Sequence, residues 1–262
     1  MNKKLFFLTT LLLLWVSLVV SAVEWVEPAD YTVAGVIGAS LENGQAPPDF
    51  PLAPNSWYYG GNYKTWVDFI ACLHVEDFHW LNYAKAGDVS ANGLNYLTQL
   101  LTHTIYPDAS GQPASTVKIV VIGFWGNDFV WLPSFDQQVM EAMVQNVNAQ
   151  IAAAKSAGVE KIIITGWPDY TDMDLDYFIS LFPELTTHID EAGYIQSKEY
   201  YYNAFSNPNP DYIFIEPWCR YTTFDGIHAA ASTSKKAALR IMDAVKRYDR
   251  LVNRKSLFCR GN

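Results

Sequence analysis

The segment VKIVVIGF, residues 117–124, decides the fold class of this chain. It is apolar on both faces, which is typical of a central strand in a parallel sheet that is covered on both sides. Two shorter apolar segments, residues 33–37 and 161–165, indicate strands of the same sheet. Further strands are expected over residues 81–86 and 211–215.

Segments with apolar residues at helical spacing separate these strands. Helices are expected over residues 64–73, over 93–102, from Ser134 to a stop at Gly158, and from about Ser232 onward. Ser134, with Gln137 three residues later, has the spacing of a capping box and predicts the start of the third helix. Strands that alternate with amphipathic helices indicate right-handed crossovers, so we predict an α/β fold with a mainly parallel sheet. Ligands bind such a sheet beyond the carboxyl ends of its strands.

The first 22 residues have the pattern of a cleaved secretory signal. Lys3 and Lys4 precede an apolar stretch that closes on the small-residue sequence Val20-Ser21-Ala22. An uncleaved membrane anchor is the alternative, although the apolar run is short of the roughly 20 residues that span a bilayer comfortably. We therefore expect a secreted or periplasmic protein whose mature part, residues 23–262, forms one domain.

The formal net charge of −9 excludes some classes of partner. A surface of this sign repels nucleic-acid phosphates and gains nothing from anionic lipid, so no nucleic-acid binding is expected. No cysteine or histidine spacing suggests zinc, and we expect neither a metal nor a cofactor. Three cysteines in an exported chain permit one disulfide. The pair Cys219 and Cys259 is preferred because it flanks the final helix, which leaves Cys72 over.

Two conspicuous runs are expected to be structural. The acidic run DYTDMDLD, residues 169–176, could hold calcium, but it lacks the glycine and the terminal glutamate of an EF-hand loop. A solvated acidic loop is therefore favoured. The aromatic runs at residues 57–59 and 200–202 could line an acyl or sugar site, although such aromatic residues more often fill a core.

Ser40 lies in AGVIGASLENG, residues 34–44, just beyond the carboxyl end of the first expected strand. Its small neighbours Gly38 and Ala39 allow a tight turn with an exposed hydroxyl, which a nucleophile needs. The alternative is a polar residue that simply ends a buried strand. A serine hydroxyl needs a neighbouring base to take its proton, so the histidines bear on this choice.

Among the five histidines, His228 has the sequence context of a catalytic base. It lies in FDGIHAA, in the loop before the last helix, and Asp225 precedes it by three residues. This spacing lets the carboxylate contact one ring nitrogen, which fixes the tautomer while the other nitrogen faces the serine. The alternative is an Asp-Gly turn in which Asp225 need not touch the histidine. The other histidines lie in local polar or helix-terminal contexts: His74, His79, His103 and His188.

Two more loops at the same expected edge carry groups that could stabilise an oxyanion. In GFWGNDF, residues 123–129, Asn127 follows the central strand and could direct a side-chain N–H into the crevice near Ser40. In NYAKAGDVS, residues 82–90, Gly87 could present a backbone N–H at the same edge. An ordinary strand-to-helix turn is the alternative for the asparagine.

The ordered set of Ser40, Gly87, Asn127 and Asp225-x-x-His228 resembles that of the SGNH hydrolase superfamily, the GDSL-type lipases and esterases. The resemblance covers nearly the whole mature chain and implies a single-domain, three-layer α/β/α fold with a flavodoxin-like sheet. It implies that Ser40 is the nucleophile of a triad with His228 and Asp225. It also implies an oxyanion hole made by the backbone N–H groups of Ser40 and Gly87 and the side chain of Asn127.

Two positions depart from the usual pattern of this family. Ala39 stands where the family usually has the aspartate of Gly-Asp-Ser-Leu, and Ala229 stands where a proline commonly follows the histidine. That aspartate typically supports the loop and is not the triad acid. Its loss therefore bears on the geometry of the Ser40 turn more than on the reaction.

The stretch DYIFIEPWCRYTTFDGIH, residues 211–228, resembles the exported bacterial branch of phospholipases, hemolysins and acyltransferases. This resemblance implies a lipid ester substrate such as a phospholipid or lysophospholipid, transient contact with a membrane surface, and acyl transfer where an alcohol replaces water. Among enzymes, the alternative is a carbohydrate acetylesterase. Outside them, it is a non-catalytic exported module that binds a lipid or glycan on the same fold.

Overall fold

The computed structural model of the chain describes residues 32–43, 57–58, 66–73, 78–102, 117–182, 185–223 and 225–252. The chain divides into two units, Met1–Asp30 and Tyr31–Asn262, and the described residues all belong to the second unit. The expected signal peptide, residues 1–22, lies outside the described part of the chain.

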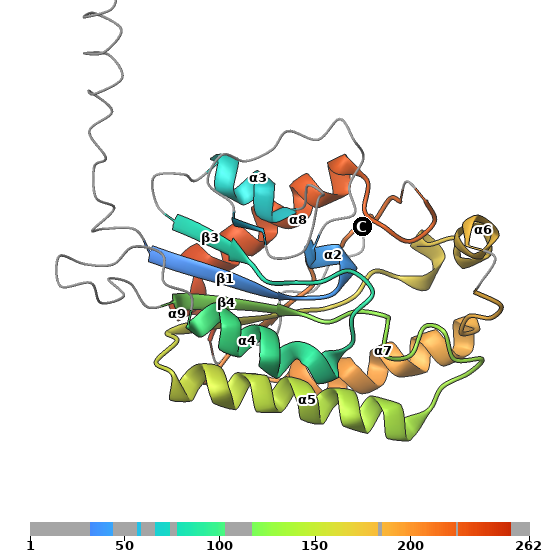
Figure 1. Cartoon of the computed structure of the whole chain (residues 1–262), viewed down its shortest axis with the longest axis horizontal. Coiled ribbons are helices and arrows are strands. Elements are labelled where there is room, and N and C mark those ends of the chain that lie inside the picture. Colours follow the sequence, from blue (N-terminus) through green and yellow to red (C-terminus); the bar gives the residue numbers. More distant parts are fainter. Residues whose placement is uncertain are drawn as a thin grey trace, which may run out of the picture. The chain divides into compact units, whose positions relative to one another are not determined.

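In that part, six parallel strands form one sheet in the order β2-β3-β1-β4-β5-β6 (Figure 1). The strands are β1 (Thr32–Gly38), β2 (Trp57–Tyr58), β3 (Phe78–Asn82), β4 (Val117–Gly123), β5 (Lys161–Thr165) and β6 (Ile213–Ile215). With the two-residue β2 left aside, this is the 2-1-3-4-5 order of a flavodoxin-like sheet. The expected fold class is confirmed.

Helices cover both faces of the sheet (Figure 1). On one face lie α3 (Trp66–Leu73) and α8 (Ala231–Lys246), and on the other α4 (Gly93–Leu101), α5 (Gln137–Ser156) and α7 (Glu191–Phe205). The shorter helices are α2 (Ser40–Asn43), α6 (Leu175–Leu181) and α9 (Tyr248–Leu251), with 3-10 turns at Ser90–Asn92 and Tyr170–Asp172. None of the described helices is both long and apolar enough to cross a bilayer.

The central strands β1 and β4 carry the tightest packing of the sheet. Every residue of β4 except Lys118 is buried, and the Lys118 ammonium pairs with Glu160 at 2.7 Å. On β1, a Cβ added to Gly35 would lie 2.3 Å from the side chain of Leu100 on α4. Glycine at this position therefore lets α4 approach the strand closely. The central strands, whose carboxyl ends carry the site, are thus held by buried contacts.

The expected capping box at Ser134 is wrong. Helix α5 begins at Gln137, and its N-cap is Asp136, whose carboxylate accepts hydrogen bonds from the N–H groups of Gln138 and Val139 at 2.9 and 3.2 Å. A short carboxylate at this position satisfies two N–H groups of the first turn. Ser134 lies exposed in the preceding loop.

Two strands have different bounds from those expected. Strand β3 covers Phe78–Asn82 and not residues 81–86. Beyond it, Tyr83 and Lys85 still donate backbone hydrogen bonds to Val36 and Gly38 of β1, whereas the N–H of Ala84 donates to the Asn82 side chain at 3.0 Å. Strand β6 covers Ile213–Ile215 and not residues 211–215, because the N–H of Asp211 bonds to the Asn209 side chain at 2.8 Å. In both places an asparagine side chain competes with the sheet for a backbone donor.

Candidate active site

Four of the predicted site residues line one cavity of about 220 Å³. Ser40 follows β1, Gly87 follows β3, Asn127 follows β4, and His228 lies in the loop before α8. Parallel strands end at the same edge of a sheet, so side chains that are far apart in sequence meet there. Asp225, the fifth predicted residue, contacts His228 from behind.

Ser40 is the first residue of α2 and is buried, with 6% of its surface exposed. The turn before it is held by the backbone, since the N–H of Ala39 donates to the carbonyl of Gly123 at 3.1 Å. The Ala39 side chain is fully buried in the core. Where the family usually has an aspartate, this turn is therefore stabilised by a main-chain bond to β4 and by a packed methyl group.

Asp225, which is partly buried, and His228, which is buried, form a pair. Asp225 Oδ2 lies 2.6 Å from His228 Nδ1, and Asp225 Oδ1 accepts the N–H groups of Ile227 and His228 at 3.0 and 2.7 Å. Burial raises the pKa of Asp225, but the hydrogen bonds and charge of His228 outweigh burial, so the pKa is lowered. Asp225 is then a carboxylate at neutral pH, which favours the tautomer with the proton on Nδ1 and a lone pair on Nε2.

The loop that carries this pair is fixed to the segment before α6. Gly226 has a φ of +96°, and its carbonyl accepts the N–H of Asp174 at 2.8 Å. A Cβ at Gly226 would lie 2.2 Å from the Asp174 carbonyl oxygen, so only glycine fits here. The Tyr221 hydroxyl donates to the carbonyl of Ile227 at 2.7 Å. The acid–base pair is thus held in place by backbone contacts on both sides.

Gly87 and Asn127 lie on two loops that are tied together. Gly87 has a φ of +78°, and Asn127 Nδ2 donates to the carbonyl of Asp88 at 2.9 Å. An amide nitrogen carries two N–H groups, so one remains to donate toward the cavity. This arrangement can present the backbone N–H of Gly87 and the side chain of Asn127 to one developing negative charge.

A buried carboxylate that the sequence did not single out completes this link. Asp128 accepts the N–H of Ser90 at 3.0 Å and the Ser90 hydroxyl at 2.7 Å. Burial raises the pKa of Asp128, and the hydrogen bonds from Ser90 oppose this only in part. The Ser90 hydroxyl also accepts a hydrogen bond from Asn146 on α5 at 3.0 Å. The loops that carry Gly87 and Asn127 are therefore fixed to each other and to α5.

The rest of the cavity lining is apolar. It consists of Trp125, Val130, Trp131, Phe178, Phe182, Leu185 and Ile227. We call Phe178, Phe182 and Leu185, which lie on and just after α6, the α6 wall. The ring of Phe178 meets the His228 ring edge-on, with 5.6 Å between centroids, and Trp131 stacks on Phe178 at 5.7 Å. Sequence reasoning gave the α6 wall no role, because a seven-residue helix is too short to show a clear apolar pattern.

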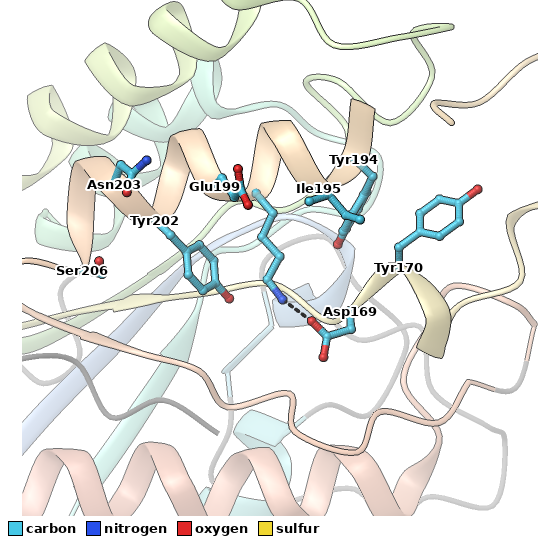
Figure 2. Close-up of a pocket in the computed structure, with 9 residues that line it drawn as sticks. Asp169, Tyr170, Tyr194, Ile195, Glu199, Tyr202, Asn203 and Ser206 are labelled. Carbon is cyan, nitrogen blue, oxygen red and sulfur yellow. Dashed lines mark hydrogen bonds and ion pairs between the residues drawn. The ribbon is translucent and has the colours of Figure 1, made fainter. Parts of the chain in front are cut away.

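A second cavity, of about 360 Å³, lies between α7 and the loop after β5 (Figure 2). Lys198 Nζ pairs there with Asp169 Oδ1 at 2.6 Å and lies over the ring of Tyr202. The Tyr194 hydroxyl donates to the carbonyl of Pro168 at 2.9 Å and accepts the indole N–H of Trp125 at 3.0 Å. None of the predicted catalytic residues lines this cavity.

The aspartates of the acidic run turn to separate partners. Besides the Asp169 pair, Asp172 accepts the N–H of Tyr221 at 3.3 Å, and Asp174 caps α6 through the N–H of Tyr177 at 2.9 Å. Asp176 lies 3.0 Å from His188. Within the described ranges, no three histidine, cysteine, aspartate or glutamate side chains are grouped to hold a metal ion. This run positions α6 and its neighbouring loops.

The remaining histidines and cysteines contribute little to the described site. His188 lies outside the 220 Å³ cavity and contacts Asp176 and the carbonyl of Ile189. His74, His103 and the side chain of His79 lie outside the described residues. Cys219 is disulfide-bonded. The side chains of Cys72 and Cys259 are likewise outside the described part, so the pairing of Cys219 with Cys259 stays a prediction.

Comparison with solved structures shows which proteins share this fold. The native aryl esterase of M. smegmatis matches 84% of this chain and 100% of its own, with a TM-score of 0.55 and 13% identity. Est24, a carbohydrate acetylesterase from Sinorhizobium meliloti, matches 83% of this chain and 99% of its own, with a TM-score of 0.54 and 18% identity. A GDSL-like lipase from Bacteroides thetaiotaomicron matches 89% of this chain and 96% of its own, at a TM-score of 0.48 and 15% identity.

No family model and no curated protein matches the sequence. The likenesses to the aryl esterase and to Est24 are therefore likenesses of fold. They confirm that the chain has the three-layer fold expected from its resemblance to the SGNH hydrolases.

Proposed function

We propose that this protein is a serine carboxylic ester hydrolase in which Ser40, His228 and Asp225 form the catalytic triad. One observation carries the proposal. The Asp225–His228 pair, with 2.6 Å between its atoms, adjoins a cavity that Ser40, Gly87 and Asn127 also line. A nucleophile, an oriented base and oxyanion donors around one cavity are the requirements of acyl transfer.

The proposed reaction has two halves. His228 Nε2 takes the proton of the Ser40 hydroxyl as its oxygen attacks the ester carbonyl, and the negative charge on the carbonyl oxygen is stabilised by Gly87, Asn127 and the Ser40 N–H. The alcohol leaves with the proton from His228. Water then attacks the acyl-enzyme with the same base, which releases the acid and restores Ser40. An alcohol in place of water would give acyl transfer.

We propose lipid esters, including phospholipids and lysophospholipids, as the substrate class. The support is the apolar lining of the cavity and the likeness of residues 211–228 to exported lipid-acting enzymes. The leader-like first 22 residues support a location outside the cytoplasm, where transient contact with a membrane surface would bring the enzyme to such esters.

The second candidate substrate is an acetylated carbohydrate. It is favoured by the likeness of fold to the carbohydrate acetylesterase Est24 and by the small volume of the cavity. A head-to-head assay of the purified protein on a lysophospholipid and an acetylated xylan separates the two. Faster turnover of the xylan ester would favour the acetylesterase.

The first test of the proposed function is the Ser40→Ala variant. Loss of the hydroxyl removes the nucleophile, so hydrolysis of a p-nitrophenyl ester and labelling by a fluorophosphonate probe should both disappear while the circular dichroism spectrum is kept. The matched control is Ser197→Ala, since Ser197 is also a buried serine but bonds to Gly193 within α7. Unchanged turnover in Ser40→Ala would exclude Ser40 as the nucleophile, and ligand binding without labelling in the wild type would indicate a non-catalytic module.

A further inference from the structure

The catalytic cavity has a polar side and an apolar side. Ser40, Gly87, Asn127 and His228 supply the polar groups, and the other described side chains that line it are aromatic or aliphatic. No charged side chain of the described residues lines it, apart from His228 when that ring is protonated. The part of a substrate that enters this cavity is therefore apolar, since burying a polar group without a partner costs free energy.

The apolar side contains one buried ring and one exposed ring. Phe178 is buried, and the rings of Trp131 and His228 fix it from two directions. Phe182 lies one turn further along, with 4.6 Å between its ring centroid and that of Phe178, and 38% of its surface is exposed. Phe182 is thus the most exposed member of the α6 wall.

We infer that this cavity binds the acyl group of a medium-chain ester and that Phe182 sets the chain length it accepts. The inference rests on the proposed function, because the carbonyl must lie at Ser40 for the acyl chain to run along the α6 wall. The cavity of about 220 Å³ fixes the scale. A methylene group needs about the room of a water molecule, roughly 30 Å³, so an acyl chain of roughly six to eight carbons fills it.

The expected signature is a break in the dependence of rate on chain length. Each methylene that enters an apolar site raises kcat/KM about fourfold, so the rate constant should climb from acetate to hexanoate or octanoate. Beyond that length the chain leaves the cavity at Phe182 and gains no further contact. A series of p-nitrophenyl esters from acetate to palmitate, assayed below their aggregation limits, measures this profile.

Two variants of Phe182 test the role of this residue. Phe182→Ala opens the cavity and should move the break to longer chains, whereas Phe182→Trp narrows it and should move the break to shorter chains. The matched control is Leu181→Ala, because Leu181 is the neighbouring residue on α6, is 45% exposed and does not line the cavity. This control should keep the wild-type profile. Phe182 is itself partly exposed, so its replacement leaves the core intact.

The outcomes separate the inference from the proposed function. A wild type that labels with a fluorophosphonate and hydrolyses esters, but prefers acetate or rises without a break to palmitate, would overturn the inference alone. So would a profile that the two Phe182 variants leave unchanged, or one that Leu181→Ala shifts as much. A wild type that neither labels nor hydrolyses any ester of the series would overturn both.

Discussion

Asp225 uses its two oxygens for different partners. Oδ2 contacts the ring of His228, and Oδ1 accepts two backbone N–H groups of the same loop. In Asp225→Asn, the amide oxygen can keep the backbone bonds while the amide N–H groups disfavour the Nδ1–H tautomer. We expect kcat for a p-nitrophenyl ester to fall by about 10⁴, as for the corresponding change in serine proteases.

The control for this change is Asp176→Asn. Asp176 also contacts a histidine, but it is exposed and its partner His188 lies outside the catalytic cavity. Its replacement should leave kcat unchanged. A loss of less than tenfold in Asp225→Asn would show that another residue is the triad acid.

At this scale, local spacing predicted some contacts and missed others. The three-residue spacing of Asp225 and His228 indicated a contact that the structure contains, because both residues belong to one loop. The hydrogen bond between Asp128 and Ser90 joins residues 38 positions apart, and no local sequence pattern predicts it. The effect of Ala39 was also beyond local reasoning, since the turn is held by a bond to Gly123 on another strand.

At the scale of elements, the contact between the His228 loop and the start of α6 depends on Gly226. An alanine there would place its Cβ 2.2 Å from the Asp174 carbonyl oxygen, in a conformation with a φ of +96°. We expect Gly226→Ala to lower the free energy of unfolding by about 1–3 kcal/mol and to lower kcat in the protein that remains folded, since the clash moves the loop that carries His228. Urea unfolding and steady-state kinetics measure the two effects.

Gly158→Ala is the matched control for this prediction. Gly158 has a similar φ of +82°, but no atom lies within 4 Å of the position of its Cβ. This variant should show the cost of the positive φ alone and no change in kcat. Equal losses of stability and activity in the two variants would contradict the assigned role of the Gly226 contact.

The elements themselves were predictable where their apolar pattern is strong. Strand β4 is buried except at Lys118 and was expected within one residue of its observed end. The start of α5 was not, because the side chain of Asp136 decides it. Helix α6 was missed because seven residues are too few to show a repeating apolar pattern. The acidic run that leads into it also resembles a solvated loop.

At the scale of the whole molecule, the lowered pKa of Asp225 links folding to pH. A carboxyl group whose pKa is lower in the folded state stabilises that state above its ordinary pKa of about 3.9, and this contribution is lost as the pH falls through the folded value. The cause is the pairing with His228, which outweighs burial. We therefore expect the stability advantage of the wild type over Asp225→Asn to be present at pH 7 and to shrink below about pH 4.

Urea unfolding of both proteins between pH 3 and pH 7 measures this difference. An advantage that stays constant down to pH 3 would show that Asp225 gains nothing from its charge in the folded protein. Asp176→Asn again serves as the comparison, because Asp176 is almost fully exposed and pairs only with His188.

The fold could be predicted from sequence more fully than the substrate. Alternating strands and helices define a three-layer fold that proteins with 13% and 18% identity share over most of this chain. The chemistry of the cavity depends on side chains from α6, the loop after β4 and the loop before α8, which only the fold brings together. The sequence alone therefore did not show that these side chains line one cavity.

The two halves of the candidate site differ in how they are anchored. Ser40 and Asn127 lie in the segments that follow the central strands β1 and β4, whereas Asp225 and His228 lie in a loop held through Gly226 and Ile227. Backbone bonds of central strands exchange their hydrogens only when most of a protein unfolds, while loops open through smaller local fluctuations. Under the proposed function, the loop with His228 can therefore open for short periods while Ser40 stays in place, so activity should be lost at a lower temperature than the folded structure.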